Sequence, residues 1–257
     1  MPSLHASHAA RYGLLLLLFL VPTVLAACTP HHDQSTFGAS GPVAEDQKNN
    51  FLFIFWVAVG VLVVVEGALV YSAIRFRKRR SDEGLAEQAH GNFRLEIAWT
   101  IAPVIILVAI AIPTVDLIYR QSVAPTGRVD PENPLEINVI GHQWWWEIDY
   151  PGEDVITANE VNIPVGRAIK VNITSDDVLH SFWVPKLGGK VDLIPGSTNF
   201  LWLQADEPGV YLGQCAEFCG EGHAMMRYRV RARTPADFQA WLESMRRPPE
   251  PLDTDDE

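Results

Sequence analysis

Two long apolar segments constrain the fold of this chain more than any other feature. Residues 51–74 form a run of 24 residues with a single charge, Glu66, and residues 97–118 form a second run that contains Pro103 and Pro113. A helix needs about 20 apolar residues to cross the roughly 30 Å hydrocarbon core of a bilayer. Both segments therefore predict membrane-spanning helices, and their closeness in the chain predicts a hairpin over residues 51–118.

Charged residues around the two spans indicate how the hairpin is oriented. The first span is followed at once by a basic cluster, Arg75, Arg77, Lys78, Arg79 and Arg80. Basic loops stay in the cytoplasm, so we expect all residues after 118 to lie on the opposite side of the membrane. Glu66 lies within a span, where an acidic residue is typical of a functional carboxylate or of contact with a partner helix.

The N-terminal segment is typical of an export signal. Arg11 precedes an apolar run over residues 14–25 that is too short to span a bilayer. Leu25-Ala26-Ala27-Cys28 resembles a bacterial lipobox, so we expect residues 1–27 to be a signal peptide and Cys28 to be the lipidated N-terminus of the mature chain. The alternative is ordinary cleavage with Cys28 unmodified. These features favour the cytoplasmic (inner) membrane of a bacterium, with the C-terminal domain on the periplasmic side.

Short alternating segments replace the apolar runs from about residue 123 onward. We expect seven strands, over residues 136–140, 144–150, 168–174, 180–184, 199–204, 210–214 and 226–231. Many short strands separated by Pro- and Gly-rich turns predict an antiparallel sandwich or barrel, and a Greek-key cupredoxin fits. Thr234 as N-cap and Pro235 at the first position predict a C-terminal helix. The fold class is thus an α+β membrane protein: a two-helix hairpin, an all-β sandwich over residues 123–247 and a short helix.

The remaining segments are polar, and the exported part is acidic. Residues 28–50 show no periodicity and predict an exposed linker, and residues 248–257 predict a disordered acidic tail. From Tyr119 onward the chain has 12 Lys and Arg residues against 22 Asp and Glu residues. Such a domain attracts basic partners and repels nucleic acid, so we expect no nucleic-acid partner.

One loop, Cys215 to Met226, concentrates metal-binding side chains in the order C-A-E-F-C-G-E-G-H-A-M-M. The chain has only three cysteines and four methionines, and two of each lie in these 12 residues around His223. Thiolate, thioether and imidazole together favour copper, and two thiolates can bridge a pair of metal ions. With His180 as a second imidazole from upstream, the loop predicts a binuclear copper centre.

Two other interpretations of the cysteines remain open at this point. An exported domain permits a disulfide, although a disulfide leaves His223 and the methionines without a purpose. Structural zinc sites use two to four residues between cysteines and then a distant histidine pair, and methionine is a poor zinc ligand.

The order and spacing of this loop resemble the dicopper CuA loop of subunit II of the haem–copper cytochrome c oxidases. The resemblance covers roughly residues 50–245 and implies a full set of metal ligands. It implies bridging thiolates from Cys215 and Cys219, terminal imidazoles from His180 and His223, and a weak thioether from Met226. It also implies that Glu217 offers its carbonyl to copper and its carboxylate to a magnesium ion shared with subunit I.

The segment Gly141–Trp146, G-H-Q-W-W-W, carries the same resemblance. Side chains alternate along a strand, so three adjacent tryptophans cannot all face one core, and alternation puts Trp144 and Trp146 on one face. The resemblance implies that Trp144 receives the electron from cytochrome c, with Gln143 beside it. Asp149 and Asp177 are implied to dock the basic face of cytochrome c.

A third matching segment surrounds Glu96, just before the second span. The resemblance implies that Glu96 lies at the entrance of a proton pathway into subunit I. The alternative is an interfacial carboxylate without a proton role.

Taken together, the resemblance implies subunit II of a respiratory cytochrome c oxidase. This subunit accepts electrons from cytochrome c and passes them to the haem centres of subunit I, where dioxygen is reduced to water with proton translocation. Partners would be subunit I, subunit III, cytochrome c and the membrane. No C-x-x-C-H motif occurs, so we expect no haem on this chain.

Three other functions compete with this interpretation. A quinol oxidase subunit II shares the hairpin and sandwich but lacks the copper ligands. A membrane-tethered protein for copper delivery or storage would need neither the tryptophan segment nor Glu96. Nitrous oxide reductase carries a similar copper loop on a much longer soluble chain.

Overall fold

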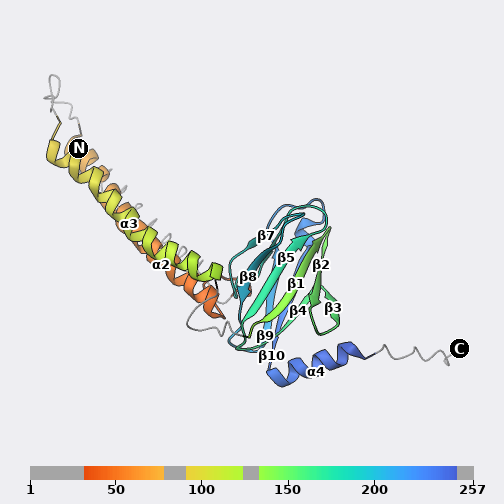
Figure 1. Ribbon diagram of the computed structural model, residues 1–257. Helices are drawn as coiled ribbons and strands as arrows, with labels where there is room; N and C mark the ends of the chain where they lie inside the picture. Colours follow the sequence, from red (N-terminus) through yellow and green to blue (C-terminus); the bar gives the residue numbers. More distant parts are fainter. Residues whose placement is uncertain (1–31, 78–90, 124–132, 248–257) are drawn as a thin grey trace, which may run out of the picture.

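The structure is a computed structural model, and it describes residues 32–77, 91–123 and 133–247. The predicted signal peptide, Cys28 and the acidic tail lie outside these ranges. Within them, the chain forms a hairpin of two long helices, a two-sheet β domain and a C-terminal helix (Figure 1). This order of elements is the one predicted from the sequence.

The hairpin consists of α2 (Pro42–Arg75) and α3 (Phe93–Val123), which run side by side away from the β domain (Figure 1). Both helices are long and apolar enough to cross a membrane. Large apolar side chains such as Leu62 and Val64 are exposed along them, as expected for helices that face lipid or partner helices. Near the β domain, Gln47 Nε2 donates to Gln121 Oε1 at 3.0 Å and so joins the two helices.

Helix α2 starts nine residues before the predicted span, so the prediction of an exposed linker is wrong for residues 42–50. Pro42 occupies the first turn, where its missing N–H costs nothing. Pro42, Val43 and Ala44 are buried, and Val43 clusters with Ala168 and Trp202 of the β domain. The first turn of α2 therefore packs on the sandwich, a contact that the polar local sequence does not indicate.

The β domain is a sandwich, as predicted, but it has two five-stranded sheets in place of the seven strands expected from the sequence. The first sheet has the order β3 (Val155–Ala158), β2 (Trp145–Tyr150), β1 (Leu135–His142), β5 (Ile169–Ser175) and β8 (Asn199–Leu203). The second has the order β4 (Glu160–Pro164), β10 (Arg227–Arg233), β9 (Gly209–Cys215), β6 (His180–Trp183) and β7 (Val191–Leu193).

The sandwich is not wholly antiparallel, which corrects the prediction. Strand β1 pairs with β5 in parallel, and β10 pairs with β4 in parallel. The reason is that the chain changes sheet between β3 and β4 and returns to the first sheet at β5. A strand that comes back by such a crossover can lie parallel to its new neighbour.

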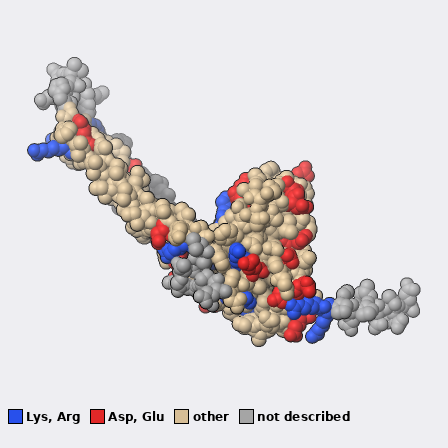
Figure 2. Space-filling model, in the orientation of Figure 1, with Lys and Arg blue, Asp and Glu red and all other residues tan. Residues whose placement is uncertain are grey.

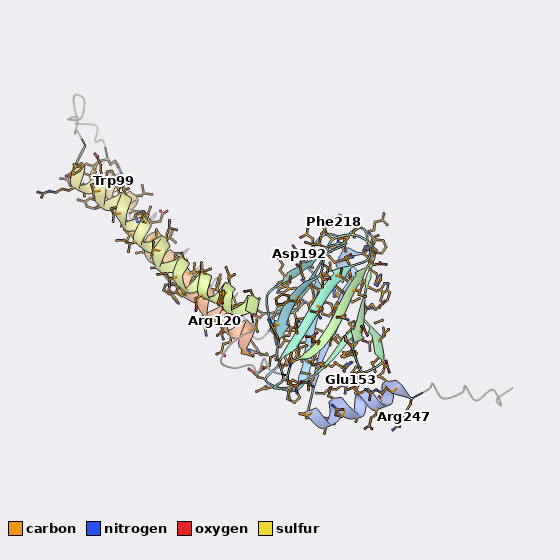
Figure 3. The ribbon with its side chains drawn as sticks, viewed as in Figure 1. Trp99, Arg120, Glu153, Asp192, Phe218 and Arg247 are labelled. Atoms are coloured by element: carbon orange, nitrogen blue, oxygen red, sulfur yellow. The ribbon has the colours of Figure 1, made fainter. Side chains whose placement is uncertain are left out.

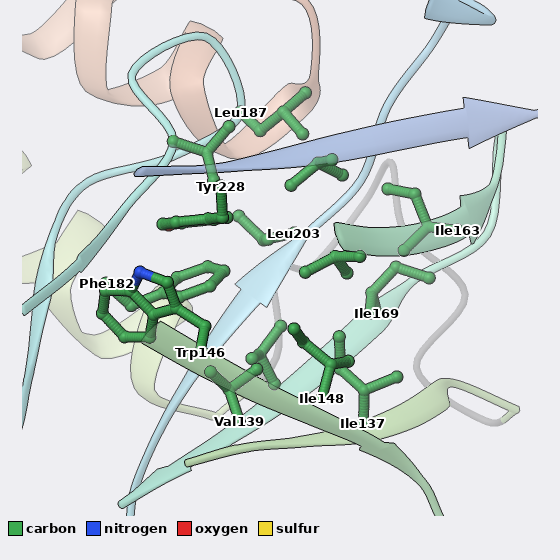
Figure 4. Packing of buried hydrophobic residues seen from close by; sticks show 14 of the residues in the cluster. Ile137, Val139, Trp146, Ile148, Ile163, Ile169, Phe182, Leu187, Leu203 and Tyr228 are labelled. Carbon is green, nitrogen blue, oxygen red and sulfur yellow. The ribbon is translucent and has the colours of Figure 1, made fainter. Parts of the chain in front are cut away.

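Alternating apolar residues from both sheets fill the core. Strand β5 buries every second residue, from Ile169 to Ser175, as a strand with one face on a core must. Figure 4 shows Trp146, Phe182 and Tyr228 packed together among aliphatic side chains. Their ring centroids lie 4.5–5.7 Å apart, so this aromatic group forms one end of the core.

Helix α4 (Pro235–Arg246) closes the opposite end of the sandwich (Figure 1). Thr234 caps it as predicted, since its hydroxyl accepts a hydrogen bond from the Asp237 amide at 3.2 Å. Phe238 and Leu242 are buried against the core. The buried face of this helix therefore packs on the sandwich.

Candidate metal centre

The predicted copper loop connects β9 to β10 at the end of the sandwich remote from α4. Figure 3 labels Phe218, a residue of the loop, at this end, and Glu153 near α4 at the other. Cys215 is the last residue of β9, and His180 is the first residue of β6. Because β6 and β9 are paired, with Phe182 opposite Cys215, the sheet itself brings His180 to the loop.

All five predicted side-chain ligands come together, in a continuous series of contacts. Cys215 Sγ lies 3.9 Å from His180 Nδ1 and 3.8 Å from Cys219 Sγ. Cys219 Sγ in turn lies 3.6 Å from His223 Nδ1 and 3.7 Å from Met226 Sδ. The ligand atoms of His180, Cys215 and Cys219 all lie within 4.8 Å of one another, which makes them a candidate metal site.

The sixth predicted ligand, the carbonyl oxygen of Glu217, also faces this group. It lies 3.1 Å from Cys215 Sγ, while the Glu217 side chain is half-buried. The two cysteines are free thiols in the described structure, which contradicts the disulfide interpretation.

The separations between donor atoms fit a bound metal. A metal ion with bonds of about 2.0–2.3 Å holds neighbouring ligands about 3.3–3.8 Å apart, close to the separations found here. Met226 is buried and touches Cys219. A thioether in the group favours copper over zinc, so the donor set fits copper.

Burial and hydrogen bonding make the two thiols unequal. Burial opposes ionisation of Cys215, but hydrogen bonds with His180 and with backbone groups outweigh it and lower the pKa of this thiol to about 6. Burial, and then the charge of Cys215, raise the pKa of Cys219 well above its usual value. The Cys215 thiolate therefore forms more readily than the Cys219 thiolate, and a bound cation would favour release of the second proton.

Asp177 fixes the ring of His180, a role that the sequence prediction missed. Its Oδ1 lies 2.8 Å from His180 Nε2 and its Oδ2 accepts from the Gln143 amide at 2.6 Å. A carboxylate on the outer nitrogen of a histidine turns the other nitrogen toward a metal, and here Nδ1 faces Cys215. The only sequence feature that could have indicated this contact is that Asp177 lies three positions before His180. The predicted docking role of Asp177 stays a prediction.

The predicted electron acceptor, Trp144, lies at the surface directly over the metal loop. Its indole N–H donates to the carbonyl of Cys219 at 3.1 Å, and Gln143 Nε2 donates to the same oxygen at 2.8 Å. The Trp144 ring packs on Gly222, where an added Cβ would lie 2.4 Å from it. An exposed aromatic ring is thus one hydrogen bond away from the backbone of a ligand.

The tryptophan segment does not alternate as expected. Gln143 and Trp144 form a turn between β1 and β2, which breaks the pattern of alternating faces. Trp144 and Trp145 are about 40 % exposed, whereas Trp146 is fully buried. The prediction that Trp144 and Trp146 share a face is therefore wrong, while the predicted exposed aromatic surface is confirmed.

The other predicted residues lie away from the metal loop. Asp149 is on β2, where its carboxylate accepts from Asn138 at 3.0 Å. Glu96 lies in the exposed first turn of α3, at the end of the hairpin remote from the sandwich. The structure brings neither residue to the candidate centre.

Comparison with known proteins matches both parts of the chain. Residues 30–117 match the family "Cytochrome C oxidase subunit II, transmembrane domain", and residues 153–233 match "Cytochrome C oxidase subunit II, periplasmic domain". The transmembrane match and the two apolar helices together identify a membrane protein.

The relatives that match most of this chain include subunits of cytochrome c oxidases and subunits of quinol oxidases. Cytochrome c oxidase subunit 2 of Alkalihalophilus pseudofirmus is 37% identical over 230 residues, which cover 90% of this chain and 67% of the relative. Quinol oxidase subunit 2 of Bacillus spizizenii is 37% identical over 234 residues, which cover 90% and 71%. The crystal structure of the periplasmic domain of cytochrome oxidase subunit II from Bradyrhizobium japonicum is 34% identical, with a TM-score of 0.43, and covers 45% of this chain and 95% of that domain.

Proposed function

Because the chain belongs to the cytochrome c oxidase subunit II family, subunits of haem–copper oxidases, we propose that it is the electron-accepting subunit. It takes electrons from cytochrome c and passes them to the haem centres of subunit I, where dioxygen is reduced to water with proton translocation. The observation that carries this proposal is the convergence of two thiols, two imidazoles and one thioether at one end of the sandwich.

These side chains would hold a pair of copper ions. Cys215 and Cys219 would bridge the pair, His180 and His223 would bind at the two ends, and Met226 with the Glu217 carbonyl would complete the set. Such a pair, when bound, takes up and releases one electron over two bridging sulfurs with little change in geometry. The protein contributes a rigid, buried setting, because His180, Cys215, Cys219 and Met226 are at most 5% exposed.

Trp144 would be the point at which an electron arrives. The ring is exposed on one side, and its N–H is bonded to the Cys219 carbonyl on the other, so it connects the surface to a thiolate ligand. Figure 2 shows acidic side chains gathered on the right-hand side of the sandwich, where β2 and β3 lie in Figure 1. These carboxylates, with Asp149 on β2 and Asp177 in the connection from β5 to β6, would steer the basic face of cytochrome c.

Similarity alone does not choose between cytochrome c and quinol as the donor. Relatives of both names reach 37% identity over about 90% of the chain. The ligand set supports cytochrome c, because quinol oxidase subunits lack the copper ligands and this chain has all five predicted side-chain ligands.

The remaining assignments belong to the same proposal and rest on the sequence and on the family resemblance. The two helices would cross the inner membrane and pack on subunit I, with subunit III as a further partner and the sandwich on the periplasmic side. The Glu217 carboxylate would share a magnesium ion with subunit I, and Glu96 would lie at a cytoplasmic proton entrance. Cys28 would carry the lipid anchor.

The test is a copper measurement on the purified oxidase complex. We expect the double variant Cys215→Ser/Cys219→Ser to lose two copper ions per complex, together with the electron spin resonance signal of a shared-valence pair. Cys28→Ser removes the third cysteine and is the matched control, with copper content unchanged. Loss of a single ion, or the spectrum of an isolated cupric centre in the wild type, would refute the proposal. Absence of a haem-containing subunit from the purified complex would instead support copper delivery or storage.

A further inference from the structure

His142 and Trp145 form the pair that closes the turn carrying Trp144. His142 ends β1 and Trp145 begins β2, and the two residues lie directly opposite each other in the strand register. Their rings stack with centroids 4.5 Å apart and planes 10° from parallel. Stacked cross-strand pairs stabilise a hairpin end, so this stack supports the turn of Gln143 and Trp144.

Two carboxylates from different elements flank the imidazole of His142. Nε2 lies 3.5 Å from Glu147 on β2, and Nδ1 lies 3.7 Å from Asp176 in the connection from β5 to β6. The His142 side chain is 20% exposed, and its Nε2 is buried without a hydrogen bond to the described residues. The imidazole is therefore kept between two acids and under the indole of Trp145, which limits its freedom to rotate.

The two exposed tryptophans are supported by different parts of the protein. Trp144 bonds to the Cys219 carbonyl and packs on Gly222, so the metal loop holds it. Trp145 is 37% exposed and stacks on His142, outside the metal loop. Loss of His142 should therefore release Trp145 while Trp144 and the metal ligands stay in place.

We propose that His142 is a positioning residue for electron-donor docking, and that it holds Trp145 in the orientation that the donor protein contacts. This inference rests on the proposed function, since it assumes that the donor binds over Trp144. A side chain that is already ordered loses less conformational freedom when a partner binds. Removing the support should weaken docking about two- to tenfold, and should leave electron transfer within the bound complex unchanged.

The test is steady-state oxidation of reduced cytochrome c by the intact oxidase. We expect His142→Ala to raise KM about two- to tenfold with kcat and the copper spectrum unchanged. His142→Phe keeps an aromatic ring under the indole and should restore most of the wild-type KM. Trp145→Ala should raise KM similarly, and adding His142→Ala to it should cause no further change, because the two residues act as one unit. Ile156→Ala, at an exposed position of β3, is the control with wild-type kinetics.

Three results would overturn the inference. One is an unchanged KM in His142→Ala, and another is full additivity of the His142→Ala and Trp145→Ala effects. The third is a lower kcat with an altered copper spectrum, which would mean that His142 supports the metal loop. If the wild-type complex does not oxidise cytochrome c at all, the proposed function fails instead, so the two failures are distinguishable.

Discussion

Asp177 orients a predicted metal ligand and also carries a surface charge, and two variants can separate these roles. Its carboxylate orients His180, and its charge contributes to the acidic surface. We expect Asp177→Ala to weaken copper binding about 10- to 100-fold, the usual effect of removing a carboxylate that supports a metal-binding histidine. The measurement is copper retention by the purified complex against a competing chelator.

The control for this prediction is the neighbouring acid. Asp176 is largely exposed and makes no contact with His180, so Asp176→Ala removes the same charge without releasing the ligand. Copper affinity should be unchanged in Asp176→Ala. Equal copper loss in both variants would show that surface charge, and not ring orientation, governs metal binding.

Gly222 is the residue that lets Trp144 approach the metal loop. Its backbone has φ −82°, which any residue adopts, so an added methyl group acts through contact alone. Because that methyl group would lie 2.4 Å from the indole, we expect Gly222→Ala to displace Trp144 and to lower kcat/KM for cytochrome c about tenfold or more. Copper content should stay the same. Gly209→Ala, where the added group meets nothing closer than 3.9 Å, should behave as wild type.

Some residues of the site can be assigned from the sequence alone, and others cannot. Cys215, Cys219, His223 and Met226 share one loop, so their spacing alone indicates a metal centre. His180 comes from another strand, and its assignment depended on the family resemblance. The supports, Asp177 on His180 and His142 under Trp145, depend on which loops meet at the end of the sandwich. The local sequence carries little information about such tertiary contacts between loops.

Strands β2 and β4 lie in different sheets, and the buried side chain of Tyr150 on β2 connects them by hydrogen bonds to the backbone of Asn162 on β4. The Tyr150 hydroxyl donates to the Asn162 carbonyl at 3.0 Å and accepts from its amide at 2.6 Å. Tyr150→Phe leaves both backbone groups without this partner, so we expect the unfolding free energy of the β domain to fall by about 1–3 kcal/mol. Denaturant titration of residues 123–247 measures this change.

The same phenol predicts sensitivity to alkali. Burial raises the pKa of Tyr150 well above its usual value of 10, so the folded domain keeps a proton that the unfolded chain releases. The stabilisation is complete below pH 10 and is lost as pH rises above it. Tyr150→Phe should therefore unfold with a weaker dependence on pH above 10. An unchanged slope in that range would show that Tyr150 does not contribute to alkaline unfolding.

Elements with strong patterns were predicted, and elements set by tertiary contact were not. The two apolar runs predicted both long helices, and Thr234 with Pro235 predicted the start of α4. Strands β3, β4 and β7 were not predicted from the sequence. Strand β4 buries four consecutive residues, so it has no alternation to detect, and β7 has only three residues. The early start of α2 depends on Val43 packing against Trp202, a contact between residues 159 positions apart.

At the scale of the molecule, apolar and charged surfaces are segregated. The hairpin presents exposed apolar side chains along its length, which suits lipid and the helices of a membrane partner. From Tyr119 onward the chain has 22 Asp and Glu residues against 12 Lys and Arg residues, an excess of ten negative charges. One part of the chain therefore fits a membrane partner, and the other fits a soluble basic partner.

This segregation predicts how salt affects the reaction with cytochrome c. Charges act over about 30 Å at 0.01 M salt but over only about 10 Å at 0.1 M, so added salt removes long-range attraction between the acidic domain and a basic donor. We expect kcat/KM for cytochrome c to fall about tenfold or more between these concentrations while kcat stays constant, because steering acts on association. A small uncharged reductant should show no such dependence. If turnover with cytochrome c is equally insensitive to salt, the acidic surface does not guide the donor, and docking must depend on Trp144, Trp145 and their apolar surroundings.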